Sequence, residues 1–140
     1  LEQALAGAKV EDVMARNVLT IPPDVTLQQA VEEFFLAHRF TAFPVQEQGR
    51  ILGMIHLDDF HSIPREEWPS LTVRQVMKPL DLEQMTIYPE QEAVRALTKM
   101  AATGQGRLLV FERGSDGRLV GLVTRTDLMN LIRVKTGLGI

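Results

Sequence analysis

Two stretches of the sequence place a carboxylate at the same spacing after a glycine. GLVTRTD, residues 121–127, ends on Asp127, and GMIHLDD, residues 53–59, ends on Asp59. Thr124 and Asp127 have the spacing of a capping box, in which two side chains bond each other's backbone at a helix start. Free N–H groups at a helix start also favour an anionic ligand. The motif therefore predicts a helix N-terminus that serves either as a cap alone or also as a ligand site.

The other polar residues near these stretches do not form a catalytic or metal-binding pattern. HLDDFH, residues 56–61, has no established metal-ligand spacing and is typical of a short exposed helix. Ser62 follows His61, but no third residue completes a nucleophile-and-base arrangement. The sequence contains no cysteine, which excludes disulfides and thiolate metal sites. We therefore expect no enzymatic activity and no metal site in this segment.

The composition is that of a folded segment with an acidic balance. With 140 residues, 45% of them hydrophobic, the chain can form one compact domain or two small lobes. A formal charge of -3 argues against nucleic acid as a partner. No apolar run approaches the roughly 18 residues needed to span a bilayer, and no signal peptide is recognisable. Because the sequence does not begin with Met, we expect a piece of a longer protein. The absence of cysteine is compatible with a reducing compartment, and we expect this soluble segment to be cytoplasmic.

The chain is an internal duplication. VEDVM at residues 10–14 returns as VRQVM at residues 73–77. GRILGMIHLDDF at residues 49–60 returns as GRLVGLVTRTDL at residues 117–128. The two offsets differ by a few residues, as loop insertions would produce.

The middle of each repeat predicts an amphipathic helix. Apolar residues recur there at i, i+3, i+4, i+7 and i+8, which places them on one helix face. Thr26 and Gln29 form a capping box at the first helix start, whereas Glu92 is a poorer N-cap that still suits the helix dipole. The apolar residues are Leu27, Ala30, Val31, Phe34 and Phe35 in the first helix, and Ala93, Ala96, Leu97, Met100 and Ala101 in the second.

A hairpin follows each of these helices. Two apolar strands flank a turn that contains Gly, at residues 42–46 and 50–56 in the first copy and at residues 107–112 and 118–124 in the second. A short helix then closes each repeat. The predicted order in each repeat is strand, helix, strand, strand, helix, which gives an α/β (α+β) fold.

These patterns divide the chain into two repeats. We assign residues 1–64 to repeat 1 with its N-terminal lead, residues 65–72 to a linker held by Trp68, and residues 73–140 to repeat 2. A repeat of about 60 residues is marginal as a separate core. We therefore expect the two repeats to pack together through their sheets and to form clefts at their junction, where ligands often bind.

The whole chain resembles a tandem CBS-domain pair, also called a Bateman module. The resemblance rests on the doubled V-x-x-V-M, the doubled β-α-β-β-α order, FPV at residues 43–45 and the GLVTRTD motif. It implies two pseudo-symmetric repeats, a homodimer, and a regulatory module that controls an attached domain allosterically. It also implies an adenosine-type ligand in the cleft between the repeats, such as AMP, ATP or another adenosyl compound, and no required cofactor.

The resemblance also implies roles for individual residues. Asp127 would accept hydrogen bonds from the two ribose hydroxyls, which suits the two acceptor oxygens of a carboxylate. Thr124 would bond ribose or phosphate. Arg107 stands two places before the position of the family's proline, here Leu109, and would bind phosphate; the alternative is a solvated charge at a strand start. Arg125, beside the motif, is a further candidate that could equally face solvent.

The first copy departs from this pattern. Asp59 is kept, but His56 stands where the second copy has Thr124, and Ala42 stands where it has Arg107. A histidine cannot replace a compact hydroxyl, and it would reach a phosphate only when protonated, around its ordinary pKa of about 6.5. The alternative is that His56 only ends a strand. We expect the ligand beside Asp127, and a weaker, altered or empty site beside Asp59.

Two further stretches give a narrower resemblance. FFLAHRFTAFPV at residues 34–45 and IPREEWPSLTVRQVM at residues 63–77 are similar to the CBS pair that follows the membrane domain in some site-2-protease-type zinc metalloproteases. The H-E-x-x-H zinc motif is absent here, so such a parent, an integral membrane protein, would hold its catalytic part elsewhere. The alternative function is a ligand-free module that only dimerises its parent.

Overall fold

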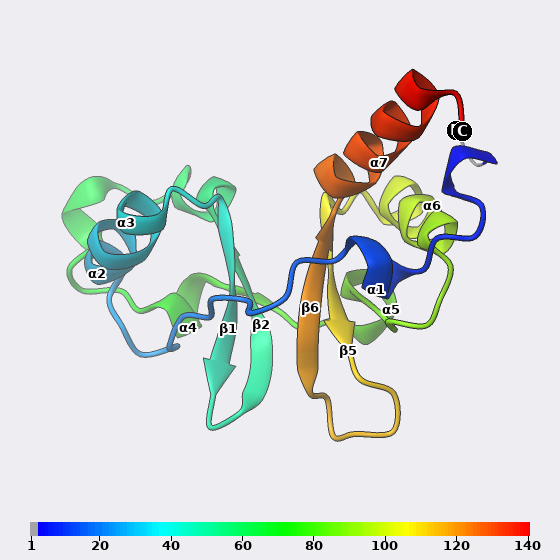
Figure 1. Ribbon diagram of the computed structural model, residues 1–140. Coiled ribbons are helices and arrows are strands. Elements are labelled where there is room, and N and C mark those ends of the chain that lie inside the picture. Colours follow the sequence, from blue (N-terminus) through cyan, green and yellow to red (C-terminus); the bar gives the residue numbers. More distant parts are fainter. Residues whose placement is uncertain (1–2) are drawn as a thin grey trace. The chain divides into compact units, whose positions relative to one another are not determined.

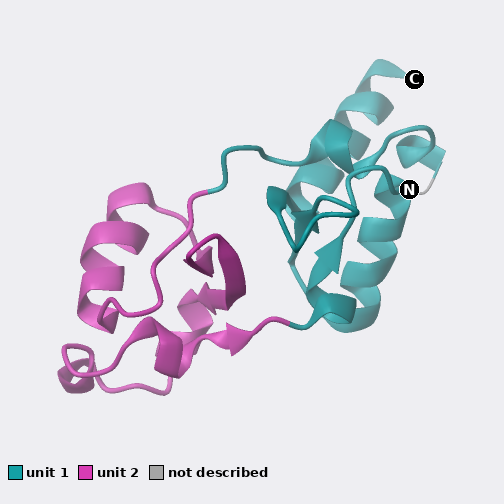
Figure 2. Cartoon of the chain, turned by 90° about the horizontal axis from the view of Figure 1, so that it is seen from below, with its two compact units in different colours: residues 1–18, 81–140 teal, residues 19–80 magenta. Residues whose placement is uncertain are grey.

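The computed structural model describes residues 3–140, and the first two residues of predicted repeat 1 lie outside this range. The chain forms two compact units, each with helices and a three-stranded sheet (Figure 1), which confirms the mixed α/β class. Unit 1 combines the chain up to Val18 with Asp81–Ile140, and unit 2 is Leu19–Leu80 (Figure 2). The units therefore do not coincide with the two sequence repeats.

Unit 1 follows the predicted order of elements. Its central part runs from strand β4 through helix α6 to the hairpin β5–β6 and the closing helix α7, and the sheet order is β4-β5-β6 with β4 parallel to β5. The elements are η1 (Gln3–Leu5), α1 (Val10–Val13), α5 (Leu82–Met85), β4 (Thr86–Ile87), α6 (Ala93–Thr103), β5 (Arg107–Phe111), β6 (Leu119–Thr124) and α7 (Arg125–Leu138).

Unit 2 contains a shortened version of the same plan. The predicted helix from Leu27 continues as an α-, π- and α-helical run to His38. The predicted first strand is reduced to one parallel bridge between Ile21 and Val45, because Pro22 and Pro23 follow and proline has no N–H for a ladder. The elements are α2 (Leu27–Ala30), η2 (Val31–Phe35), α3 (Leu36–His38), β1 (Ala42–Glu47), β2 (Arg50–His56), η3 (Leu57–Phe60), η4 (Arg65–Glu67), α4 (Val73–Val76) and β3 (Lys78–Pro79).

Each repeat sends its leading segment into the core formed by the other repeat. We call residues 10–15 lead segment 1 and residues 73–78 lead segment 2. Val10 is buried in the core of unit 1, and Val73 is buried in the core of unit 2. Backbone hydrogen bonds hold both segments in place: the N–H of Val10 bonds Gln91 O, and that of Val73 bonds Val25 O. The boundaries assigned at 64 and 73 thus describe sequence repeats, whereas the compact units exchange these segments.

The predicted linker lies within unit 2. Trp68 is half-buried, packs edge-on against Phe60 with ring centroids 5.6 Å apart, and donates its indole N–H to Ile63 O. The backbone N–H of Gln28 bonds Trp68 O, and that of Leu27 bonds Leu71 O. The second half of the linker, from Trp68 to Thr72, is therefore attached to the start of helix α2.

The glycine of each motif makes room for a lead segment. A Cβ on Gly53 in strand β2 would stand 2.0 Å from the backbone oxygen of Lys78, and a Cβ on Gly121 in strand β6 would stand 2.5 Å from the sulfur of Met14. The two glycines occupy the same place in the two copies. Their duplication in the sequence therefore has a packing reason besides any ligand.

We predict that Gly53→Ala destabilises the protein more than Gly121→Ala. At Gly53 the obstacle is backbone, which cannot rotate away, so the expected loss is on the order of 1–3 kcal/mol. At Gly121 the nearest atom belongs to the flexible Met14 side chain, and the nearest backbone atom, the oxygen of Ala15, would stand 2.9 Å away instead of 2.0 Å. Gly137→Ala in helix α7, where a Cβ meets nothing within 4 Å, is the control and should stabilise by about 0.5–1 kcal/mol. Urea unfolding followed by circular dichroism measures all three; equal stability of Gly53→Ala and Gly137→Ala would contradict the close approach.

An exposed ion pair ties helix α4 to the loop before helix α2. Arg74 Nε and Nη2 donate to the two carboxylate oxygens of Asp24 at 2.9 and 3.0 Å, and Arg74 also donates to Glu47. The hydrogen bond from Arg74 lowers the pKa of the Asp24 carboxyl. The pair therefore stabilises the fold above the unfolded-state pKa of about 3.9, and this contribution is lost as the pH falls through the lower folded-state pKa.

We predict that Asp24→Asn slightly lowers the melting temperature at neutral pH, and that this difference disappears as the pH falls from about 3.9 through the lowered folded-state pKa of Asp24. The effect is small because the groups are exposed, and about 1 M salt should reduce it further. Thermal melts of the variant and the wild type across this pH range measure it. Asp116→Asn, in the exposed turn after strand β5, is the control; a difference for Asp24→Asn that persists at low pH would contradict the ion-pair explanation.

Candidate functional site

The motif of the second copy forms the start of helix α7. Thr124 Oγ1 accepts the backbone N–H of Asp127 at 3.1 Å, and Asp127 Oδ2 accepts the backbone N–H of Thr124 at 3.1 Å. This is the capping box that the spacing predicted, and it needs no ligand. Within residues 3–140, however, the other oxygen of Asp127, Oδ1, accepts no hydrogen bond. Asp127 is half-buried, so the carboxylate keeps one acceptor for a ligand while it caps the helix.

The two arginines predicted near this motif lie in different surroundings. Arg107 starts strand β5 and is the register partner of Thr124 on strand β6, so the strand pairing brings Arg107, Thr124 and Asp127 to one end of the sheet. Arg107 is half-buried. Arg125 is exposed at the first turn of helix α7, and its backbone N–H bonds Gly106 O. Arg107 is therefore the better placed cation.

The first copy forms a cap of a different kind. His56 ends strand β2, and its Nδ1 accepts the backbone N–H of Asp58 at 3.0 Å, one residue earlier than the bond made by Thr124 in the second copy. The helix that follows, η3, is a single 3₁₀ turn of 4 residues, compared with 14 residues in helix α7.

The carboxylate of Asp59 has a partner on each oxygen. Oδ2 accepts the backbone N–H of His56 at 2.8 Å, and Oδ1 accepts the Nζ of Lys78 at 3.0 Å. The Asp59 side chain is 8% exposed, whereas the Lys78 side chain is 67% exposed. The two motif carboxylates thus differ: both oxygens of Asp59 accept hydrogen bonds, one of them from Lys78, whereas one oxygen of Asp127 accepts none from residues 3–140.

Lys78 was missed in the sequence, although a signal was there. VEDVMA and VRQVMK align over residues 10–15 and 73–78, so Lys78 stands opposite Ala15. The structure confirms this equivalence, because Lys78 pairs with Met54 on strand β2 and Ala15 pairs with Leu122 on strand β6. A comparison of the two lead segments would have found a cation beside the first motif.

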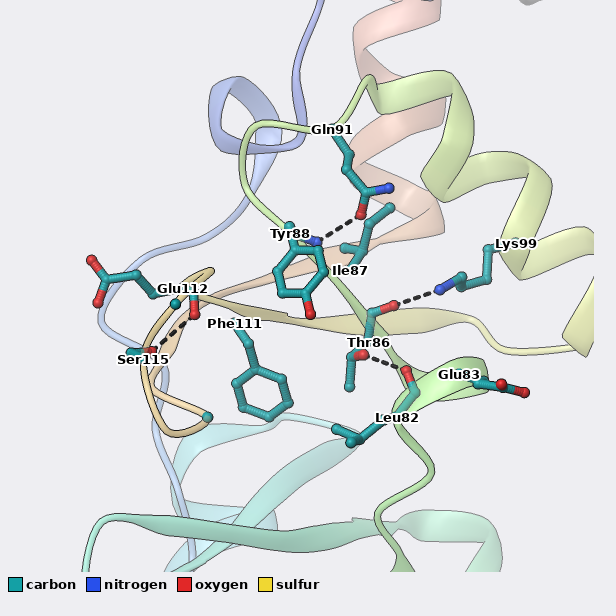
Figure 3. A pocket seen from close by; sticks show the side chains of 12 residues that line it. Leu82, Glu83, Thr86, Ile87, Tyr88, Gln91, Lys99, Phe111, Glu112 and Ser115 are labelled. Carbon is teal, nitrogen blue, oxygen red and sulfur yellow. Dashed lines mark hydrogen bonds between the residues drawn. The ribbon is translucent and has the colours of Figure 1, made fainter.

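A cavity of about 460 Å³ lies in unit 1 at the other end of the sheet from Thr124. Figure 3 shows Tyr88 and Phe111 on its walls and the Lys99 ammonium, which donates to Thr86 O at 2.8 Å. Arg113 lies 3.9 Å from the centre of the Tyr88 ring. Because Phe111 pairs with Leu119, five residues before Thr124, this cavity does not include the motif, and no sequence pattern pointed to it.

Other site types were searched over the described chain. Within residues 3–140, no group of three His, Cys, Asp or Glu side chains could hold a metal ion. His56 Nδ1 and His61 Nε2 lie 3.4 and 3.7 Å from the Asp58 carboxylate, but these three do not form such a group. Over the same residues, no helix has the length and apolarity to cross a bilayer.

Known proteins resemble this chain over nearly its full length. A zinc metalloprotease of Methanocaldococcus jannaschii is 29% identical over 135 residues, which covers 96% of this chain and 35% of that protein. The chain thus spans about a third of the length of the curated relatives it matches first.

Solved structures with the same fold include two nucleoside complexes. The CBS domain of a bacterial CNNM/CorC family Mg²⁺ transporter in complex with ATP has a TM-score of 0.82 and 20% identity, and the match covers 94% of this chain and 92% of that one. The CBS domain pair of protein MJ0100, in complex with 5′-methylthioadenosine and S-adenosyl-L-methionine, has a TM-score of 0.77 and 18% identity, and covers 91% and 98%. At these identities the likeness concerns the fold.

The comparison with protein families confirms the resemblance to a CBS-domain pair. The CBS-domain model matches twice, at residues 10–65 and at residues 73–134. Each match contains one lead segment, one hairpin and one motif carboxylate. The chain therefore belongs to the CBS-domain family, as a tandem pair of CBS domains.

Proposed function

We propose that this CBS pair is a regulatory module that binds an adenosine-type nucleotide beside Asp127. The observation that carries the proposal is the open Oδ1 of Asp127, next to a Thr124 hydroxyl at a helix N-terminus. A carboxylate with one oxygen fixed by the backbone presents the other in a set direction, as an acceptor for ribose hydroxyls. AMP, ATP and S-adenosylmethionine are the first ligands to test.

The surroundings of Asp127 support an anionic ligand. The first N–H groups of helix α7 and the guanidinium of Arg107, on the neighbouring strand, lie at the same end of the sheet. Both favour a phosphate or a carboxylate. Complexes of related CBS domains with ATP and with S-adenosyl-L-methionine support the ligand class, although those proteins share only 18–20% identity with this chain.

We also propose that the module acts on an attached domain. The matched relative is about three times as long and is named as a zinc metalloprotease, so the proposed attached domain is a membrane metalloprotease with this pair on its cytoplasmic side. The proposed active form is a homodimer. A ligand would change the attached domain only if it bound one of two conformations of the pair more tightly than the other.

A ligand-free dimerisation module is the second candidate. It is favoured by the side-chain caps at both motifs and by the Lys78–Asp59 contact, because none of these needs a ligand. The two candidates differ in whether any adenosine compound stabilises the folded chain.

We predict that at least one of AMP, ATP, adenosine and S-adenosylmethionine raises the melting temperature with increasing concentration. A ligand at 100 times its dissociation constant adds about 2.7 kcal/mol, which corresponds to several degrees. Asp127→Asn keeps an acceptor for the backbone of Thr124 but removes the charge, and should abolish most of the shift. Asp59→Asn should matter less.

Asp116→Asn is the control for loss of one carboxylate. Differential scanning fluorimetry at several ligand concentrations, followed by isothermal titration calorimetry, provides the measurement. No shift with any of these compounds at millimolar concentration would reject the sensor and leave the dimerisation module. Equal effects of Asp127→Asn and Asp59→Asn would reject the assignment to the second motif.

A further inference from the structure

In each half of the duplicated pair a strand or segment that pairs with the motif strand contributes a cation, but the two cations come from different elements. In unit 1 the cation is Arg107 on the strand that pairs with the motif strand, and the lead segment contributes Ala15. In unit 2 the corresponding strand contributes Ala42, the register partner of His56, and the lead segment contributes Lys78. Both halves therefore have a positive charge near the motif, but it comes from the neighbouring strand in unit 1 and from the lead segment in unit 2.

This difference decides what each carboxylate can accept. A ribose needs acceptors for two neighbouring hydroxyl groups, and a carboxylate bonded once to its own backbone has one oxygen left for them. Asp127 retains that oxygen. At Asp59 the same oxygen accepts a charge-assisted hydrogen bond from Lys78 at 3.0 Å.

We propose that Lys78 is a built-in counter-ion that closes the Asp59 half-site, so that a sugar hydroxyl must displace its ammonium in order to bind there. This rests on the proposed function, because it concerns the same class of ligand. Lys78 is then the residue that makes the pair bind on one side in preference to the other. His56, which the sequence analysis held responsible, is the N-cap of helix η3.

The backbone of Lys78 is fixed, whereas its side chain is not. Lys78 pairs with Met54, its carbonyl oxygen lies against the space left by Gly53, and the backbone N–H of Leu80 bonds Leu52 O at 2.9 Å. The side chain is two-thirds exposed and extends over a nearly buried Asp59. The ammonium can therefore leave the carboxylate without a rearrangement of the sheet, and the closure is reversible.

The test measures the Asp59 half-site by itself. Adenosine, which has the ribose but no phosphate, and AMP are titrated calorimetrically into Asp127→Asn and into Asp127→Asn/Lys78→Met. Methionine keeps the length of the side chain and removes the ammonium. We expect both compounds to bind more tightly to the double variant by up to about fivefold, the range given by displacement of a partly exposed ion pair.

A matched control and a native probe locate the effect. Lys135→Met in the Asp127→Asn background removes the same charge from helix α7 of unit 1 and should leave both affinities unchanged. Trp68, the single tryptophan, contacts Phe60, the residue after Asp59, so its fluorescence should respond to ligand in the double variant. Lys78→Arg should stay closed, because a guanidinium also bonds a carboxylate.

The outcomes separate this proposal from the proposed function. Unchanged affinity in the double variant overturns the closure, and so does weaker AMP binding with unchanged adenosine binding, which would make Lys78 a phosphate ligand. If the wild type and all variants bind neither compound, and ATP and S-adenosylmethionine do not bind either, the proposed function fails. The closure is then decided by urea unfolding of Lys78→Met, Asp59→Asn and the combination: non-additive shifts of the midpoint support the contact, and additive shifts overturn it.

Discussion

The arrangement of this protein depends on the close approach of each lead segment to the motif strand of the other repeat. Gly53 and Gly121 are the points of contact, since any side chain there would overlap Lys78 or Met14. The approach anchors Val73 and Val10 in cores that are formed mainly by the other repeat. A marginal repeat of about 60 residues thereby shares its core with its duplicate, which explains why the sequence occurs as a pair.

The same approach determines what stands beside each motif carboxylate. A lead segment that pairs with the motif strand places its sixth residue, Ala15 or Lys78, opposite the position two residues before the cap. An alanine there leaves the carboxylate to the capping box, and a lysine fills its second oxygen. A single residue outside the motif can thus make one half-site differ from the other while the motif keeps its Asp.

Much of the fold could be predicted from the sequence because it is local. The helix starts at Leu27 and Ala93, the hairpins and the cap at Thr124 follow from spacing and turn chemistry, and the structure confirms them. The exchange of lead segments could not be predicted, because a repeat does not indicate which core it enters. The loss of the first strand in unit 2 follows from the prolines after Ile21, whose effect on a parallel bridge depends on tertiary pairing. The Lys78–Asp59 contact needed both the exchange and the register.

The positions of the lead segments bear on how a ligand could influence an attached domain. The chain passes from unit 1 to unit 2 after Val18, three residues beyond Ala15, and returns after Leu80, two residues beyond Lys78. Both crossings therefore begin next to a motif strand. A ligand that changed the position of a lead segment on its motif strand would also change the position of the connecting chain that follows it. Such coupling still requires two arrangements with different affinities for the ligand. The contact of Lys78 with Asp59, formed or broken, is one local difference by which two such arrangements can be distinguished.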